Sequence, residues 1–416
     1  MKTEADSRPS EGRESAPANP VKLPVYLDNH ATTPLDPRVL EAMLPYLQAK
    51  FGNPSSRSHA YGWEASKAVE AARDQVATLI GAEPGEIVFT SGATESDNLA
   101  IKGVAEARRG RGRHVVTVLT EHKAVLDSCN HLEDCGFEVT FLSVRGDGLI
   151  DLDQFRSCLR PDTILATIMA ANNETGVLQP TAEIGGICRQ RGILFHTDAA
   201  QAVGRVPLDV TKQSIDLLSI SAHKLYGPKG VGALYVRNGP EVCVAPQIHG
   251  GGHQHGLRSG TLNTPGIVGL GKACDLAARG LPEESCRIAG LRNRLRDQIL
   301  AGLDGVLING SSEQRLPGNL NMSFAGVKGE DLLTAMDDIA VSSGAACTSD
   351  RTEPSNVLKA LGLSDEMAQA SVRFGQPVFF STYSLAAASS MGRTFSFMGW
   401  IQSETLTHFA PSHCCI

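Results

Sequence analysis

The sequence has few features of a membrane or nucleic-acid-binding protein. Among its 416 residues, no run approaches the ~18 consecutive apolar residues that a transmembrane helix needs. The formal net charge is −7, and no basic run or aromatic-interleaved basic patch is present. A broad nucleic-acid footprint needs such a patch. We therefore expect no membrane association and no direct nucleic-acid partner.

The first twenty residues lack the features of a targeting segment. They are polar and contain four acidic side chains. A secretory signal needs an apolar core, and transit peptides are poor in acids. We expect residues 1–20 to form a disordered extension, and we expect the protein to be cytoplasmic.

The ten cysteines show no C-x-x-C pair and no regular spacing. This pattern does not fit a metal site, so no metal is expected. A cytosolic protein keeps such thiols reduced, and we interpret most of them as small buried apolar residues. Cys347 differs, because the small polar residues around it, SSGAACTS at 342–349, lack core periodicity and are typical of a loop.

The composition is that of a soluble globular protein, with 42% hydrophobic and 20% charged residues. The length favours two domains over one. Alternating strand and helix patterns between about residues 64 and 240 predict a mostly parallel sheet covered by helices. The expected strands are 87–90, 115–119, 138–142, 164–169, 193–197, 217–221 and 232–236. The expected helices are 64–80, 97–109 and 122–135, followed by 291–303 and 330–340 in a second, smaller domain.

Ligands of such sheets bind beyond the carboxyl ends of the strands. After strand 87–90 come the small residues of 91–96, whose backbone N–H groups at a helix start suit an anion, although a plain helix cap explains them equally. Asp198 follows strand 193–197, where a buried acid needs a cation such as a protonated pyridine nitrogen. A cap for the next helix is the alternative.

Lys224 follows strand 217–221, together with the possible phosphate donors Ser221 and His223. The lysine is either an ordinary surface residue or a reactive amine that forms a Schiff base. An anion cradle, an acid and a lysine at three strand ends together favour pyridoxal 5'-phosphate (PLP). His122 also follows a strand and can exchange protons, and Thr261 ends a glycine-dense loop where its hydroxyl can reach a phosphate.

From about Tyr26 to Gly375 the chain resembles the PLP-dependent cysteine desulfurases of the housekeeping iron–sulfur assembly type, in the class V aminotransferase-like group. Nine stretches in family order carry the resemblance: YLDNHATTPLDPRV, FGNPSSRSHAYGWEA, VFTSGATESDNLAIKG, TEHKAVLD, NNETGVLQP, HTDAAQAVG, SAHKLYGPKGVGALYV, HGGGHQHGLRSGTLN and AVSSGAACTS. The family usually has Glu-Arg where this chain has Gln254-His255.

The resemblance implies an α/β, aspartate aminotransferase-like fold of PLP-dependent transferases, with a mostly parallel large-domain sheet and a smaller α+β domain. The implied large PLP-binding domain is 37–276. The implied small domain is 21–36 with 277–375 and carries the cysteine loop. The likeness stops after Gly375, and residues 376–416 form an atypical tail whose only charges are Arg393 and Glu404.

The resemblance also implies a role for each matching residue. Lys224 forms the Schiff base with PLP, His122 stacks on its ring, and Asp198 pairs with the pyridine nitrogen. Gln201 contacts the ring hydroxyl, and Arg373 holds the carboxylate of the substrate as a bidentate fork. The implied phosphate contacts are Ala93, Thr94, Ser221 and His223. Asn173 lies on the cofactor and substrate side, and Thr261 reaches the phosphate of a neighbouring subunit, which implies a homodimer.

The implied activity converts L-cysteine to L-alanine and moves the sulfur, as a persulfide on Cys347, to acceptor proteins. The acceptors are an iron–sulfur scaffold, a tRNA-thiolation carrier or both. Two alternatives stay open. One is a selenocysteine or cysteine lyase on the same fold, and the other is a cofactor-binding protein whose altered tail impairs turnover.

Overall fold

The computed structural model describes residues 23–343 and 354–377. Its larger part is built on a seven-stranded sheet with the order β2-β8-β7-β6-β5-β3-β4. The strands are β2 (Ile87–Thr90), β3 (His114–Val118), β4 (Glu138–Leu142), β5 (Thr163–Thr167), β6 (Leu194–Asp198), β7 (Leu217–Ser221) and β8 (Gly232–Val236). Strands β4, β3, β5, β6 and β7 run parallel, and β8 is antiparallel to both β7 and β2. The predicted mostly parallel sheet is confirmed.

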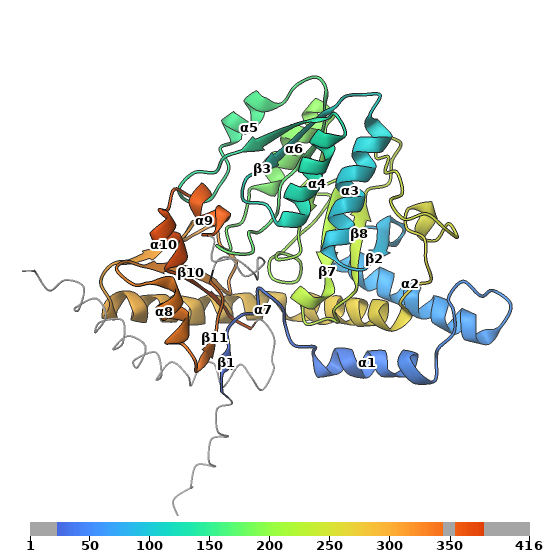
Figure 1. The fold of residues 1–416 in the computed structure, drawn as a ribbon. Helices are drawn as coiled ribbons and strands as arrows, with labels where there is room; N and C mark the ends of the chain where they lie inside the picture. Colours follow the sequence, from blue (N-terminus) through green and yellow to red (C-terminus); the bar gives the residue numbers. More distant parts are fainter. Residues whose placement is uncertain (1–22, 344–353, 378–416) are drawn as a thin grey trace, which may run out of the picture.

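Helices cover both faces of this sheet (Figure 1). They are α2 (Ala60–Ile80), α3 (Ala93–Arg108), α4 (Lys123–Asp134), α5 (Leu152–Cys158) and α6 (Thr181–Arg191). Neighbouring strand residues point to opposite faces, so Val115 and Leu217 pack in one apolar cluster with α3 and α4. Val116 and Leu218 pack in another, with residues of α2, α6 and α7. Such doubly covered strands explain the nearly continuous apolar runs of the sequence.

The smaller part contains two further sheets, with the orders β12-β10-β9 and β1-β11. Their strands are β1 (Val25–Tyr26), β9 (Val306–Ile308), β10 (Asn319–Phe324), β11 (Ile339–Ala340) and β12 (Ser371–Gly375). The short helices beside them are α8 (Gly329–Thr334), α9 (Asn356–Ala360) and α10 (Asp365–Gln369). The helix predicted over 330–340 is therefore too long, because the chain leaves it after Thr334 to pair β11 with β1.

A long helix, α7 (Thr264–Gly302), runs along the base of both parts (Figure 1). Helix α1 (Pro37–Gln48) and α2 pack against it. The predicted helix 291–303 is its last portion. The predicted boundary between residues 276 and 277 falls inside α7, which is continuous there. The predicted division into domains therefore stays a prediction. Three single 3₁₀ turns complete the described elements: η1 (Pro84–Glu86), η2 (Ala222–Lys224) and η3 (Gln254–Gly256).

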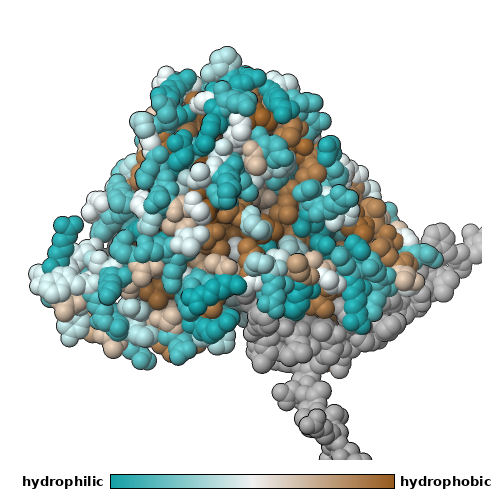
Figure 2. Space-filling model, turned by 180° about the vertical axis from the view of Figure 1, so that it is seen from behind, coloured by the Kyte–Doolittle hydropathy of each residue, from teal (hydrophilic) through white to brown (hydrophobic). Residues whose placement is uncertain are grey.

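The surface carries several exposed apolar side chains. Leu40, Leu44 and Leu47 lie on the outer side of α1, and Phe51 and Trp63 are exposed nearby in the sequence. Figure 2 shows the opposite face of the molecule from Figure 1, where hydrophobic residues gather in the middle of the surface among hydrophilic ones. In the described ranges, no helix combines the length and apolar character needed to cross a membrane.

Seven cysteines lie in the described residues, and all are free thiols. Cys129, Cys188 and Cys274 are buried as predicted, and burial raises the pKa of Cys129 and of Cys274 to about 12. Cys135, Cys243 and Cys286 are exposed instead. The prediction that most cysteines are buried is thus only partly confirmed among the described residues.

Candidate active site

A cavity of about 520 Å³ lies at the carboxyl ends of the parallel strands. The loops after β2, β3, β5, β6 and β7 each contribute to its wall, as do a segment near the N-terminus and strand β12. Ten of the predicted site residues line it: Ala93, Thr94, His122, Asn173, Asp198, Gln201, Ser221, His223, Lys224 and Arg373. These ten residues are up to 280 positions apart in the sequence, from Ala93 to Arg373, and meet in one cavity.

Lys224 reaches the cavity from η2, directly after β7. Its Nζ atom donates to the carbonyl oxygens of His30 and Ala31, at 2.7 Å in each case. Arg205 is buried beneath and donates to the carbonyl oxygens of Lys224, at 2.9 Å, and Asn29, at 2.7 Å. The lysine therefore lies in a fixed frame and is not on a mobile surface turn.

Asp198 is the last residue of β6 and is buried. One carboxylate oxygen accepts a hydrogen bond from the backbone N–H of Ala200 at 2.9 Å. Burial raises the pKa of Asp198, while the charge of His122 and the Ala200 hydrogen bond oppose that rise. A carboxylate in this place is stabilised by a cation in the cavity, and a protonated pyridine nitrogen is such a cation.

Two further acids lie buried around Asp198. Asp97 and Glu121 are almost fully inaccessible. Burial raises the pKa of both well above the usual range, and the charge of Asp198 adds to the effect. Of these three buried acids, Asp198 is the one that lines the cavity.

The loop between β2 and α3 forms an anion cradle. Gly92 caps α3 with φ 153° and ψ −179° and without a side-chain hydrogen bond. Only glycine adopts this backbone conformation readily. A Cβ atom on Gly232 in β8 would lie 2.6 Å from the Cα of Gly92, so glycine is needed there for close approach. The backbone N–H groups that begin the helix are therefore available to a phosphate, which is favoured by the helix dipole.

Ser221 and His223 form the other side of this cradle. His223 Nδ1 lies 3.0 Å from the hydroxyl of Thr32. Burial, followed by the charges of Lys224, Lys229 and Arg205, lowers the pKa of His223 to about 4. His223 is thus neutral at physiological pH, so its ring can contact an anion by hydrogen bonding and not by charge.

His122 is the N-cap of α4, where its Nδ1 accepts a hydrogen bond from the backbone N–H of Ala124 at 3.1 Å. In the neutral ring this bond leaves the proton on Nε2. The side chain lines the cavity, so the second ring nitrogen is the one suited to proton exchange there.

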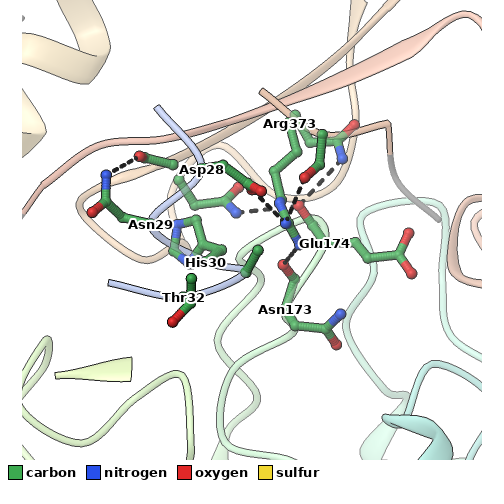
Figure 3. A network of polar contacts seen from close by, with 12 residues as sticks. Asp28, Asn29, His30, Thr32, Asn173, Glu174 and Arg373 are labelled. Carbon is green, nitrogen blue, oxygen red and sulfur yellow. Dashed lines mark hydrogen bonds and ion pairs between the residues drawn. The ribbon is translucent and has the colours of Figure 1, made fainter. Parts of the chain in front are cut away.

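Arg373 lies on β12 with only 2% of its surface exposed. Figure 3 shows its guanidinium between two other segments of the chain. Nη1 donates to the carbonyl oxygen of Asn173 at 2.8 Å, and Nη2 donates to Asp28 Oδ1 at 2.7 Å and to the hydroxyl of Ser342 at 3.2 Å. Three of the guanidinium N–H groups, which were predicted to bind a substrate carboxylate, therefore already donate hydrogen bonds within the protein.

One predicted residue within the described part of the chain is not brought into the cavity. Thr261 is exposed and does not line it. Cys347 lies outside the described residues. The atypical tail after residue 377 lies outside them as well.

Sequence reasoning missed the N-terminal contribution to the site. His30, Ala31 and Thr32 line the cavity, as does Lys229, and Asp28 pairs with Arg373. The polar cluster in YLDNHATTP was visible, but nothing local linked it to a strand more than 340 residues away. That link is made by pairing of the N-terminal segment with β12.

The residues of the cavity fit PLP by their chemistry. A phosphate suits the start of α3 with Ser221 and His223, and a pyridine nitrogen suits the buried Asp198. An aldehyde suits Lys224. Gln201 Nε2 donates to the carbonyl oxygen of His30 at 2.9 Å, which fixes its side chain at the wall of the same cavity.

The chain belongs to the aminotransferase class-V family, which matches residues 25–377. The cofactor of this family is PLP. Among its relatives, the cysteine desulfurase IscS of Anaeromyxobacter dehalogenans is 59% identical over 355 residues, which are 85% of this chain and 88% of that protein. The cysteine desulfurase of Pongo abelii is 55% identical over 367 residues, which are 88% of this chain and 80% of that protein.

Solved structures give the same assignment. A NifS-like protein superposes with a TM-score of 0.82 at 37% identity, covering 93% of this chain and 100% of the other. A structure described as SspA in complex with cysteine superposes with a TM-score of 0.76 at 40% identity, covering 85% of this chain and 99% of the other. The predicted fold and family are confirmed.

Proposed function

We propose that this chain is a PLP-dependent cysteine desulfurase, which converts L-cysteine to L-alanine and passes the sulfur on. The observation that carries the proposal is the meeting of Lys224, Asp198, the cradle at Gly92 and Arg373 in one cavity. Relatives 55–59% identical to this chain bear the name cysteine desulfurase.

The residues of the cavity divide the chemistry among them. When bound, PLP withdraws electrons from the α-carbon of the amino acid. Arg373 binds the α-carboxylate through the N–H of Nη1 that has no partner within the described residues. Lys224 and His122 take the proton from the α-carbon and return one to the product. Asp198 keeps a positive charge on the pyridine nitrogen by supplying the opposite charge in a buried place.

Cys347 is the proposed sulfur carrier. Its thiolate attacks the sulfur of the substrate, so that an S–S bond forms while the carbon–sulfur bond breaks. The electron pair of the broken bond stays with carbon, which takes up a proton and leaves as L-alanine. Cys347 keeps the sulfur as a persulfide. Acceptor proteins then receive it, and these are an iron–sulfur scaffold or a tRNA-thiolation carrier.

We also propose a homodimer. Helix α1 is apolar on two sides: Val39 and Met43 are buried, whereas Leu40, Leu44 and Leu47 are exposed. A helix that is apolar on both sides is usually covered on both. A second copy on the outer side of α1 would explain the exposed leucines, and Thr261 would then contact the phosphate in the partner subunit. The cytoplasm stays the proposed location.

The test is to incubate the purified protein with L-cysteine and a thiol reductant and to measure L-alanine and sulfide. We expect equal amounts of both, and at least about 10²-fold less of each from Lys224→Ala. Two results together would favour a lyase. The enzyme would turn over L-selenocysteine as fast as L-cysteine, and Cys347→Ala would be as active as the wild type. A yellow protein that produces no alanine would favour a cofactor-binding protein without turnover.

A further inference from the structure

The guanidinium of Arg373 has few donors left for a ligand. Of its five N–H groups, one on Nη1 and two on Nη2 are engaged by Asn173, Asp28 and Ser342. Nε has no partner in the described part of the chain and is shielded from solvent. Among these acceptors only Asp28 carries a charge, so Asp28 largely determines how the guanidinium is held.

The backbone fixes Asp28 next to Arg373. Asp28 bridges Gly375 in parallel, two residues after Arg373 in β12. Gly375 donates to the carbonyl oxygen of Leu27 at 2.6 Å and accepts from the N–H of Asn29 at 3.1 Å. A Cβ atom on Gly375 would lie 2.8 Å from the His30 ring and 2.9 Å from the backbone nitrogen of Asn29. The two segments are therefore in close contact, and Asp28 has little freedom to move away.

The surroundings of Arg373 make this pairing consequential. Arg373 is buried, and the charges of Arg205 and Lys224 lie close to the same N-terminal segment. A buried guanidinium without a counter-charge is costly and would turn toward any anion within reach. Asp28, whose side chain is 17% exposed, supplies that counter-charge at 2.7 Å.

We propose that Asp28 is a positioning residue that holds the Arg373 guanidinium in the orientation that receives the α-carboxylate of the amino-acid substrate. This inference rests on the proposed function. Because Asp28 occupies Nη2, the substrate carboxylate binds the hydrogen of Nη1 that remains. Without Asp28 the guanidinium loses its fixed plane, and the carboxylate loses a preorganised partner.

The experiment compares two ligands of the PLP-loaded enzyme, L-alanine and ethylamine, which differ only by the carboxylate. Their Kd values are read from the absorbance of bound PLP, so turnover is not required. We expect Asp28→Ala to weaken L-alanine binding by about tenfold and to leave ethylamine binding unchanged. Asp28→Asn keeps an oxygen that accepts from Nη2 but lacks the charge, so it should recover only part of the loss. The matched control Ser342→Ala removes a neutral acceptor and should have the smaller effect.

Three results would overturn the inference: unchanged L-alanine binding in Asp28→Ala, tighter binding, or an equal loss for ethylamine, which would mean a structural role. If Asp28→Ala does not fold, the Kd values of Asp28→Asn for L-alanine and ethylamine test the inference instead. In that variant, a loss of about twofold to fivefold for L-alanine alone supports the inference, and no loss contradicts it. A wild-type enzyme that makes no alanine from cysteine would refute the proposed function separately.

Discussion

Ser355 donates its hydroxyl hydrogen to the carboxylate of Glu174, and this contact ties the start of α9 to the loop after β5. The backbone carbonyl of Glu174 accepts in addition from the side chains of Asn319, at 3.1 Å, and Asn321, at 3.2 Å. Its neighbour Asn173 accepts from Arg373. One loop of the larger part therefore holds several elements of the smaller part beside the cavity.

Glu174 gives the first prediction. Burial raises its pKa to about 7, although the Ser355 hydrogen bond and the charges of Arg373 and His122 oppose the rise. Because the folded pKa exceeds the unfolded value, the unfolded state loses its proton first. Stability should therefore fall as the pH rises from about 4.5 to 7. Glu174→Gln should remove this loss. The free energy of unfolding of the variant relative to wild type should therefore be roughly 1–3 kcal/mol higher at pH 8 than at pH 5. Urea unfolding of both proteins at pH 5 and at pH 8 measures this free-energy difference between variant and wild type. If the difference is the same at the two pH values, the raised pKa of Glu174 is contradicted.

The second prediction separates Lys224 from Cys347. Lys224→Ala should lose the absorbance of lysine-bound PLP and lower alanine formation by about 10²–10⁴-fold, because the proton-transfer group is gone. Cys347→Ala should keep the absorbance and lose sulfur transfer to an acceptor. The measurements are a visible spectrum and a labelled-sulfur transfer assay. Sulfur transfer at the wild-type rate by Cys347→Ala would remove that residue from the mechanism.

The third prediction concerns Asp198. Asp198→Ala removes the buried charge opposite the pyridine nitrogen, and this charge matters most in the transition state. Turnover per protein chain should fall by at least about tenfold more than PLP occupancy does. Both are measured on the same preparation, by alanine formation and by PLP content. Equal losses would mean that Asp198 only holds the cofactor.

The fourth prediction is an acid sensitivity centred on His196. This histidine is fully buried, and burial lowers its pKa to about 3. Its ring nitrogens lie 2.8 Å from the Thr167 hydroxyl and 3.0 Å from the Ser219 hydroxyl. Because the unfolded state binds a proton below about pH 6.5, stability should decrease by about 1.4 kcal/mol per pH unit below that value. The decrease should continue until about pH 3.

His196→Asn should make this dependence shallower by about one proton between pH 6 and 4. The variant is expected to be less stable than wild type at pH 7, because the hydroxyl contacts change. The slope and not the absolute stability is the readout, obtained from urea unfolding across that pH range. An unchanged slope would assign the acid sensitivity to other buried groups.

The sequence predicted the strands of the large sheet to within one or two residues, since each is a buried apolar run ended by turn residues. It predicted α7 poorly, identifying only its last portion. Glycines and Pro282 lower helix propensity in its first part. Packing explains two of these glycines, because a Cβ on Gly269 would lie 2.7 Å from Met43 Sδ and one on Gly271 would lie 2.6 Å from the Cα of Ala72.

Residues at strand ends were predictable because strand order places them together, as with Asp198 and Lys224. Asp28 and His30 were not predictable as site residues, because their position at the cavity depends on pairing of the N-terminal segment with β12, near the other end of the described chain. Gln254 shows the same limit. It differs from the family pattern, yet it is buried and accepts a hydrogen bond from the backbone N–H of Phe89 at 2.9 Å. Its role is structural, and no local pattern shows that.

Gly375 separates the described cavity residues from the atypical ending of the chain. Every described residue that lines the cavity lies before it, with Arg373 the last. The residue after it, Gln376, is still fixed by a hydrogen bond from its N–H to the carbonyl oxygen of Gly318 at 2.8 Å. Among the residues that the structure describes, the whole lining of the cavity thus lies upstream of this glycine. A substitution after Gln376 therefore leaves the identity of all of those cavity residues unaltered.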